Sequence, residues 1–392
     1  MPLSKEHPMK KWSISIFALV LIVMVGIAAI NYIVDPFGYF VFQSGNFNDL
    51  KTDVDKTYCI REFKANHIRY FGNNYDAFLI GGSKAGSYRP EKLKELDGLN
   101  YYNMFVIGGS MYEYWLDTSY VLKHAHPKKI ILSISGGEVN KEIWDQKDMT
   151  FYIPALFTGK SRTKEKFDFL LKDVKKSYDL IQRRTSEKAH DEIATGGELV
   201  AQGNRDLTHY YESIKEDAER FVRRYVLEFY KIHMETLFKT NLKSDHIDTT
   251  INYLKDIKGM CDAAGVELIV IVAPSFIGEL AEFESTYYRD FLAEIALTTP
   301  YWDFSGYNEL NLNPYNYYNE GHFLYEMADL VIDTMNGKKS YPGFGEYVTR
   351  ENAIAHIDAR QADYDRLKAL YEKEGPDALL QGQEDSSCLL NR

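Results

Sequence analysis

The chain has 392 residues, of which 45% are hydrophobic and 14% aromatic, so it can bury a sizeable core and is not a disordered protein. Its formal net charge of −11 provides no overall basic surface for phosphate neutralisation, and we expect no nucleic-acid partner. Its cysteines, Cys59, Cys261 and Cys388, are scattered without a CxxC pair, so we expect no metal site, redox motif or cofactor.

The first predicted element is a membrane anchor at residues 12–34. The run from Ile14 to Val34 carries no charge, and about 21 residues at about 1.5 Å each just span a hydrocarbon core of about 30 Å. Lysines at positions 5, 10 and 11 precede the run, which predicts that residues 1–11 are cytoplasmic and the main domain is extracytoplasmic. A cleaved signal peptide is the alternative, but the run exceeds a usual h-region and no clear A-x-A site follows.

After a membrane-proximal segment at 35–76, short apolar runs alternate with helical patterns. Strands are predicted at 77–80, 102–107, 129–135, 266–273 and 301–304, and helices at 111–124, 247–264 and 324–335. This alternation predicts a three-layer α/β/α domain with a parallel sheet over residues 77–340. Ligands bind such sheets beyond the carboxyl ends of the strands.

The third and fourth predicted strands are too far apart in sequence for one ordinary crossover, which indicates an insertion at about 144–245. Helical periodicity over 210–238 indicates that the insertion is helical. It could cover the strand ends as a lid or substrate platform, but we favour a decoration whose aromatic stripe packs on the sheet. Three glycines within 194–205 predict a mobile loop.

The segments that flank the predicted domain carry less chemistry. Residues 341–392 read as a C-terminal helix, with apolar spacing over 350–374, followed by a polar tail. In the membrane-proximal segment, Arg61 and Lys64 could face an anionic substrate, but we interpret them as partners in surface ion pairs.

The candidate chemistry begins at Ser83, which follows the apolar run 77–80 and two glycines. A serine hydroxyl needs an imidazole to accept its proton, and His322 is the candidate base. Backbone amides near Gly82 and Gly109 could stabilise a developing oxyanion, and a side chain at Gly82 would crowd the substrate. The competing interpretation makes Ser83 the N-cap of the next helix and His322 an ordinary residue near a helix start.

Taken together, these segments resemble the SGNH/GDSL hydrolase superfamily. The resemblance rests on the anchor, Asp35-Pro36-Phe37-Gly38, Gly81-Gly82-Ser83, Gly108-Gly109-Ser110 and Asn319-x-x-His322-Phe323, and it covers roughly residues 77–335. It is closest to membrane-anchored bacterial members related to D-alanyl-lipoteichoic acid biosynthesis esterases and surface-polysaccharide O-acetylation proteins. The resemblance implies a flavodoxin-like sheet, with Ser83 as nucleophile, Gly109 as oxyanion donor and His322 as general base.

The sequence departs from the family pattern in two blocks. The family's last block usually reads Asp-x-x-His, but Asn319 stands at the acid position, and an amide can orient a histidine without supplying negative charge. Glu320, Asp303 or Asp117 could substitute for the acid. The expected Gly-x-Asn-Asp block is replaced by residues 135–140, Ser-Gly-Gly-Glu-Val-Asn, in which the side chains of Glu138 and Asn140 are candidates for lining the site.

These features predict an extracytoplasmic serine esterase or O-acyltransferase that acts on acyl groups of a cell-envelope glycan or a teichoic-acid-like polymer. The alternative, favoured by Asn319, is a catalytically degenerate module that binds such a polymer or a membrane-bound acyltransferase. The two predictions share the same site and differ in whether Ser83 is reactive.

Overall fold

The computed structural model describes residues 8–46, 56–140, 152–185, 202–228, 230, 246–284 and 287–380. Its centre is a six-stranded sheet in the order β2-β1-β3-β4-β5-β8. The first five strands are parallel and β8 is antiparallel to β5. The strands are β1 (Ala77–Gly81), β2 (Tyr101–Asn103), β3 (Lys129–Ile134), β4 (Glu267–Val272), β5 (Tyr301–Asp303) and β8 (Glu346–Val348).

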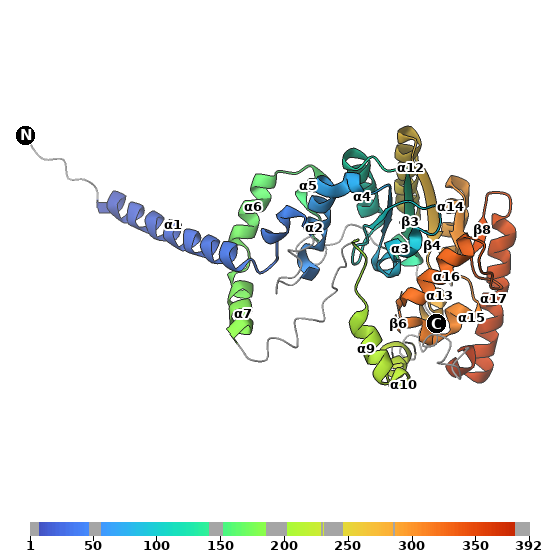
Figure 1. Ribbon diagram of the computed structural model, residues 1–392. Coiled ribbons are helices and arrows are strands. Elements are labelled where there is room, and N and C mark those ends of the chain that lie inside the picture. Colours follow the sequence, from blue (N-terminus) through green and yellow to red (C-terminus); the bar gives the residue numbers. More distant parts are fainter. Residues whose placement is uncertain are drawn as a thin grey trace, which may run out of the picture.

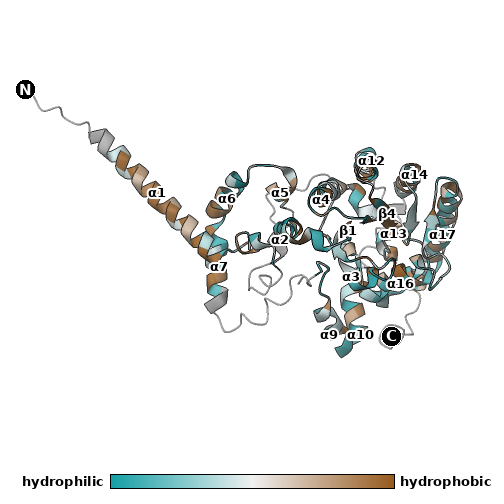
Figure 2. Ribbon diagram, turned by 45° about the horizontal axis from the view of Figure 1, so that its top comes forward, coloured by the Kyte–Doolittle hydropathy of each residue, from teal (hydrophilic) through white to brown (hydrophobic). Residues whose placement is uncertain are grey.

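Helices cover both faces of this sheet, as the sequence predicted. Figure 2 shows α4, α12, α14 and α17 along one side of the strands and α3 and α16 on the other. β1 is buried along its whole length, as expected for a parallel strand covered on both faces. These helices are α3 (Pro90–Leu93), α4 (Met111–His124), α12 (Ile247–Ala264), α14 (Tyr288–Thr298), α16 (Tyr325–Met335) and α17 (Ala353–Glu374).

The predicted strands and crossover helices are confirmed, with one shortened strand. The sequence predicts a strand at 102–107, whereas β2 ends at Asn103. Beyond it, the amides of Met104 and Val106 still donate to carbonyls of β1, at 2.7 and 3.0 Å. The Lys64 ammonium donates to the carbonyls of Asn103 and Phe105, at 2.9 and 2.7 Å. These two carbonyls are therefore bonded by a side chain and not by the backbone of a neighbouring strand.

A long apolar helix, α1 (Pro8–Val34), projects from the body (Figure 1). Residues Trp12–Val34 are long and apolar enough to cross a bilayer, which makes α1 a candidate membrane anchor; a signal sequence has the same properties. Helix α2 (Lys56–Phe71), in the segment expected to lie next to the membrane, lies beside the sheet domain and buries Ile60, Phe63 and Ile68 in the common core.

The predicted insertion is helical in its described parts, but its helices lie in two separate places. α6 (Arg162–Leu171) and α7 (Val174–Thr185) lie at the base of α1 and both contact it, whereas α5 (Ala155–Thr158) lies between α6 and α4. α9 (Thr208–Glu216) and α10 (Ala218–Val222) lie below the sheet domain in Figure 1. The first half of the insertion therefore does not cover the strand ends.

The segment between these two groups was predicted to be a mobile loop at 194–205. Residues 194–201 lie outside the described part, but Gly203, Asn204 and Arg205 are buried. The Asn103 amide donates to the Gln202 carbonyl at 2.8 Å, and the Arg205 amide donates to the Gly86 carbonyl at 3.0 Å. The described end of this loop is therefore attached to core elements through its backbone, and mobility remains a prediction for the loop.

The remaining elements follow β4 and β5. They are α13 (Ile277–Glu284), α15 (Glu309–Leu312) and a small antiparallel hairpin of β6 (Tyr317–Asn319) and β7 (His322–Phe323). The sequence did not predict this hairpin or the edge strand β8.

Candidate active site

Ser83 lies at the point where the strand order of the sheet reverses. β1 has β2 on one side and β3 on the other. In doubly wound sheets, ligands bind at such a point, where the loops after the two neighbouring strands run to opposite faces. Ser83 follows β1, and Glu138 belongs to the 3₁₀ turn Gly136–Asn140 that follows β3.

The serine turn is held by hydrogen bonds from several elements. Ser83 begins a 3₁₀ turn, Ser83–Ser87, whose end is fixed by a bond from Ser87 Oγ to the Phe323 carbonyl on β7, at 2.6 Å. The Asn103 side chain donates to the carbonyls of Ala85 and Tyr88, both at 2.8 Å. Ser83 is not a helix N-cap, because Gly82 occupies that position and no side chain caps the turn.

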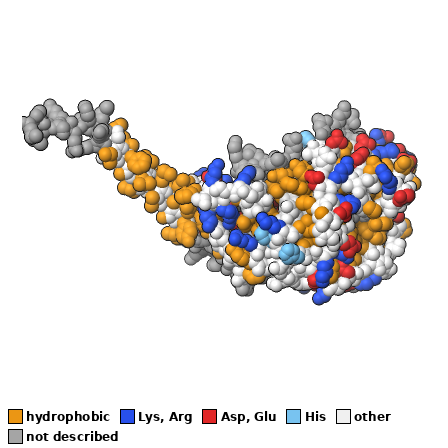
Figure 3. Space-filling view, turned by 90° about the horizontal axis from the view of Figure 1, so that it is seen from above, with side chains coloured by type: hydrophobic (Ala, Val, Ile, Leu, Met, Phe, Trp, Pro, Cys, Tyr) orange, Lys and Arg blue, Asp and Glu red, His pale blue; other side chains and the backbone are white. Residues whose placement is uncertain are grey.

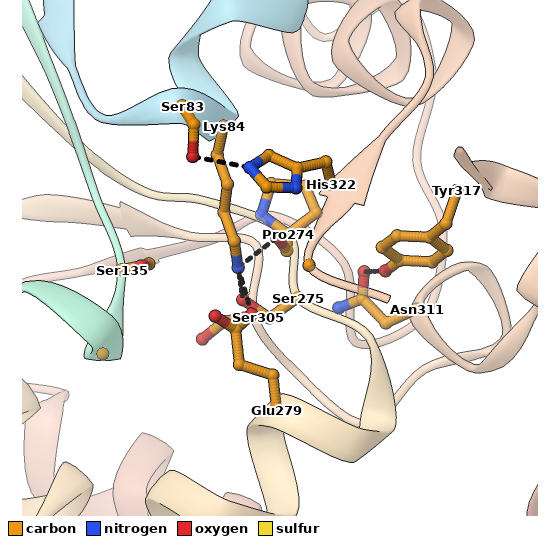
Figure 4. Close-up of polar contacts among 12 residues, drawn as sticks. Ser83, Lys84, Ser135, Pro274, Ser275, Glu279, Ser305, Asn311, Tyr317 and His322 are labelled. Atoms are coloured by element: carbon orange, nitrogen blue, oxygen red, sulfur yellow. Dashed lines mark hydrogen bonds and ion pairs between the residues drawn. The ribbon is translucent and has the colours of Figure 1, made fainter. Parts of the chain in front are cut away.

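The hydroxyl of Ser83 instead meets the imidazole of His322, with 2.5 Å between Oγ and Nε2 (Figure 4). The two residues are 239 positions apart in the chain, and both side chains are partly exposed. The structure therefore brings together the serine and the histidine singled out from the sequence, where a substrate can reach them.

The hairpin around His322 determines which ring nitrogen carries the proton. The Gly321 amide, which can only donate, lies 3.0 Å from Asn319 Oδ1, so that atom is the amide oxygen. The same oxygen lies 2.8 Å from His322 Nδ1, so Nδ1 must donate to it. In a neutral ring, Nε2 is then free of a proton and accepts the Ser83 hydroxyl.

Among the four candidates for the acid position, Asn319 is the residue that contacts Nδ1. Glu320 lies in the turn between β6 and β7. The carboxylate of Asp303 bonds with Ser305, His356 and Arg360. Asp117 is buried on α4, where burial first and then Glu113 raise the pKa of its carboxyl well above the usual range.

Both candidate oxyanion glycines pack against the ring of Tyr114 on α4. A Cβ on Gly82 would lie 2.7 Å from the Tyr114 hydroxyl, and a Cβ on Gly109 would lie 2.5 Å from the ring carbon Cε1. Within the described part of the chain, the Gly109 amide makes no hydrogen bond. Glycine at these positions is therefore required by packing, and the Gly109 N–H stays a candidate oxyanion donor.

Glu138 is held in the wall of the site. Its carboxylate accepts from the Tyr114 hydroxyl at 3.0 Å and from the amide and hydroxyl of Ser135 at 2.8 and 2.6 Å. Burial, and then this carboxylate, raise the pKa of Tyr114 well above its usual range, so the phenol stays a donor. Asn140 ends the same turn, and its side chain lies outside the described part of the structure.

Lys84, which the sequence analysis did not single out, extends from the serine turn toward the end of β4 (Figure 4). Its buried ammonium lies 2.5 Å from Ser275 Oγ and pairs with Glu279 on α13. A lysine directly after the candidate nucleophile and a serine directly after Pro274 are the signals that could have pointed to this contact. These two contacts tie the serine turn to the segment that follows β4, which is separated from β1 by β3 in the sheet.

Arg61 and Lys64 are fully buried, so the prediction of surface ion pairs is wrong. Arg61 forms a salt bridge with Glu113 and donates to the Ile107 carbonyl at 2.7 Å. Lys64 donates to three carbonyls, including that of Gly203 in the insertion at 2.9 Å. These cations lie inside the core because the backbone carbonyls at the irregular end of β2 need donors.

A second residue missed by the sequence analysis, Tyr318, stacks on the His322 ring with 5.5 Å between centroids. Its hydroxyl accepts from the buried Arg205 of the insertion at 2.7 Å. The insertion therefore contacts the histidine through Tyr318. Within the described ranges, no group of three or more His, Cys, Asp or Glu side chains could hold a metal ion.

The chain matches no protein-family model, and no curated protein matches its sequence.

Proposed function

We propose that this protein is a membrane-anchored serine esterase or O-acyltransferase of the SGNH type, with its main domain outside the cytoplasm. The observation that carries the proposal is the hydrogen-bonded row Ser83 Oγ, His322 Nε2, His322 Nδ1 and Asn319 Oδ1. A nucleophile bonded to a base that is itself oriented by a third group is the arrangement of serine acyl transfer.

In this mechanism, Ser83 Oγ attacks the acyl carbonyl carbon while His322 Nε2 takes the hydroxyl proton. The carbonyl double bond becomes an oxyanion, and the tetrahedral intermediate then collapses. The leaving alkoxide takes the proton from Nε2, and the acyl group stays on Oγ. Water, in an esterase, or an acceptor hydroxyl, in an acyltransferase, gives its proton to Nε2 and attacks the acyl carbon. The second tetrahedral intermediate collapses, the bond between the acyl carbon and Oγ breaks, and Ser83 Oγ takes the proton back from Nε2.

The oxyanion would be stabilised by backbone N–H groups of the two glycine loops. The amide of Gly109, which makes no hydrogen bond within the described residues, is the first such donor. The amide of Ser83, directly after Gly82 at the start of the serine turn, is the second. Fixed donors of this kind need no reorganisation during the reaction, and loss of one costs about 10²–10³ in kcat.

The substrate class follows from the anchor and the partly exposed site. A domain held at the outer face of a membrane meets polymers of the cell envelope, and we propose acylated glycans or teichoic-acid-like polymers as substrates. A membrane-bound acyltransferase is the proposed partner if the acyl group is delivered across the membrane.

The test is Ser83→Ala in the full-length, detergent-purified protein, assayed on a short acyl ester and with a fluorophosphonate probe. We expect the parent protein to be labelled at Ser83 and to turn over the ester, and the variant to lose both. Ser213→Ala, at a serine of α9 whose hydroxyl donates to the His209 carbonyl of the same helix, serves as the control and should keep probe labelling. Equal turnover by the Ser83→Ala protein would exclude Ser83 as the nucleophile.

The non-catalytic module is the second candidate, and Asn319 is the observation that favours it. A triad without its carboxylate loses up to about 10⁴ in turnover, roughly 5 kcal/mol of transition-state stabilisation. A protein that binds the polymer but is not labelled at Ser83 by the fluorophosphonate would establish this function.

A further inference from the structure

The helices α6 and α7 lie at the end of the candidate membrane anchor. Asn31, near the end of α1, donates to the carbonyls of Leu170 and Lys172 at 3.0 and 2.7 Å, and accepts from Ser177 Oγ at 2.7 Å. These bonds attach the junction between α6 and α7 to α1 at Asn31, three residues before the end of the helix. Figures 1 and 2 both show the two helices running across the end of α1.

The position of Asn31 along α1 corresponds to a membrane–water interface. Trp12 and Tyr32 are both exposed on α1, and 20 residues of helix place them about 30 Å apart along its axis, the thickness of a hydrocarbon core. Tryptophan and tyrosine favour the headgroup region at the two ends of a membrane span. Asn31 is next to Tyr32, so the α6–α7 junction lies at headgroup depth.

The exposed side chains of α6 and α7 fit this depth. Phe167 and Tyr178 are each 60% exposed. Large apolar side chains recur every three or four residues on the exposed surface of both helices: Phe167, Leu171, Val174, Tyr178 and Ile181. The opposite side of α6 is buried, with Phe169 stacked on Tyr39 at 3.9 Å. Such a helix places its apolar face at the boundary between headgroups and acyl chains.

The charge of this segment differs from that of the whole chain. Residues 162–181 contain six Lys or Arg and four Asp or Glu, a net charge of +2 in a chain of net charge −11. Figure 3 shows Lys and Arg side chains gathered where α1 meets the body. Basic side chains near an anionic surface each contribute about 1 kcal/mol to binding.

We infer that α6 and α7 form a lipid-binding platform that lies in the headgroup layer of an anionic membrane, on the side where α1 ends. The platform is residues 162–181. Its apolar side chains enter the acyl boundary, and its lysines, among them Lys164, Lys166 and Lys175, contact lipid phosphates. Because α6 and α7 also bond with Asn31, the platform fixes the orientation of the sheet domain relative to the bilayer.

The test uses the full chain in vesicles of phosphatidylcholine, alone or mixed with phosphatidylglycerol. The photo-crosslinking residue p-benzoylphenylalanine replaces Phe167 or Tyr178. Ile354, 76% exposed on α17, is the matched control away from α1, and Ile22 in the middle of the span is the positive control. Covalent adducts with phospholipid are measured by mass spectrometry after irradiation.

We expect adducts at positions 167 and 178 at roughly ten times the level at 354, with higher yield when phosphatidylglycerol is present. Lys164→Gln with Lys166→Gln should remove much of that gain and leave the yield in phosphatidylcholine unchanged. Yields at 167 and 178 equal to that at 354, or adducts to protein instead of lipid, would overturn the platform. Absence of lipid adducts at 22 would overturn it as well, because α1 would not be in the bilayer.

Discussion

Asn319 occupies the position from which a carboxylate usually stabilises a protonated catalytic histidine. Its Oδ1 fixes the His322 tautomer and ring direction through one hydrogen bond, and the Gly321 amide fixes Oδ1 in turn. Orientation is therefore supplied by the hairpin, whereas charge stabilisation is not. These two contributions can be separated by substitution.

We expect Asn319→Asp to raise kcat on an acyl ester by about tenfold or more, because a carboxylate accepts the same two hydrogen bonds and also stabilises the imidazolium. The acid limb of the pH–kcat profile should move to higher pH for the same reason. Asn319→Ala should lower kcat by about 10²-fold, because the ring loses its orientation. Steady-state kinetics between pH 5 and 9 would measure all three proteins, and a lower kcat in Asn319→Asp would contradict the proposed role.

At the scale of elements, the two glycine loops and α4 form one packed unit. Tyr114 contacts Gly82 through its hydroxyl and Gly109 through its ring, and Glu138 holds that hydroxyl from the loop after β3. The loops that follow β1, β2 and β3 thus all pack against the side chain of Tyr114. Small changes in this ring move both candidate oxyanion donors.

This packing predicts that Tyr114→Phe restores the activity of Gly82→Ala more than that of Gly109→Ala. Gly82→Ala and Gly109→Ala should each lower kcat, since the new Cβ lies 2.7 Å from the Tyr114 hydroxyl in one case and 2.5 Å from its ring in the other. Adding Tyr114→Phe removes the hydroxyl and should restore part of the activity of Gly82→Ala, but little of that of Gly109→Ala. Equal rescue of both variants, measured as kcat with Tyr114→Phe as the control, would show that the contacts are not responsible.

Some of these elements could be predicted from the sequence and others could not. The period-3.6 apolar pattern located α4 and α12 at their observed bounds, because burial of one face of a helix leaves a local signature in the sequence. The hairpin β6–β7 left none, since its strands are very short and its pairing depends on one turn. The burial of Arg61 and Lys64 was missed because their carbonyl partners come from residues about 40 or more positions away.

At the scale of the whole molecule, the C-terminal helix α17 closes the far edge of the sheet. Asp303 lies at the end of β5, and its Oδ2 contacts two side chains of α17. Arg360 Nη1 is 3.0 Å away and His356 Nε2 is 2.8 Å away. Burial alone would raise the pKa of Asp303, but Arg360 and His356 outweigh it and hold the pKa well below its usual range. The stability from this contact is present above the ordinary carboxyl pKa and is lost as pH falls through it toward the lower folded value.

Arg360→Leu should therefore lower the free energy of unfolding by about 3–5 kcal/mol at neutral pH, because it leaves a buried carboxylate without its main partner. The difference in unfolding free energy between Arg360→Leu and the parent should also shrink as pH falls through the ordinary carboxyl pKa, since the parent then loses the stability that comes from the lowered pKa of Asp303. Urea unfolding of the detergent-purified chain at several pH values would measure both effects. Arg350→Leu, at an exposed arginine, is the control and should change the unfolding free energy by less than about 0.5 kcal/mol.

The sequence by itself determined the apolar run of α1, the strands and crossover helices of the α/β domain, and Ser83 and His322 as the candidate nucleophile and base. Only the tertiary structure decided that Ser83 and His322 meet, that Asn319 orients the ring, and that the insertion divides between the anchor and the histidine hairpin. The physical reason is range. Periodicity and turn chemistry act over a few residues and can be read along the chain, whereas hydrogen bonds such as Ser83–His322 and Asn31–Lys172 depend on how distant elements pack.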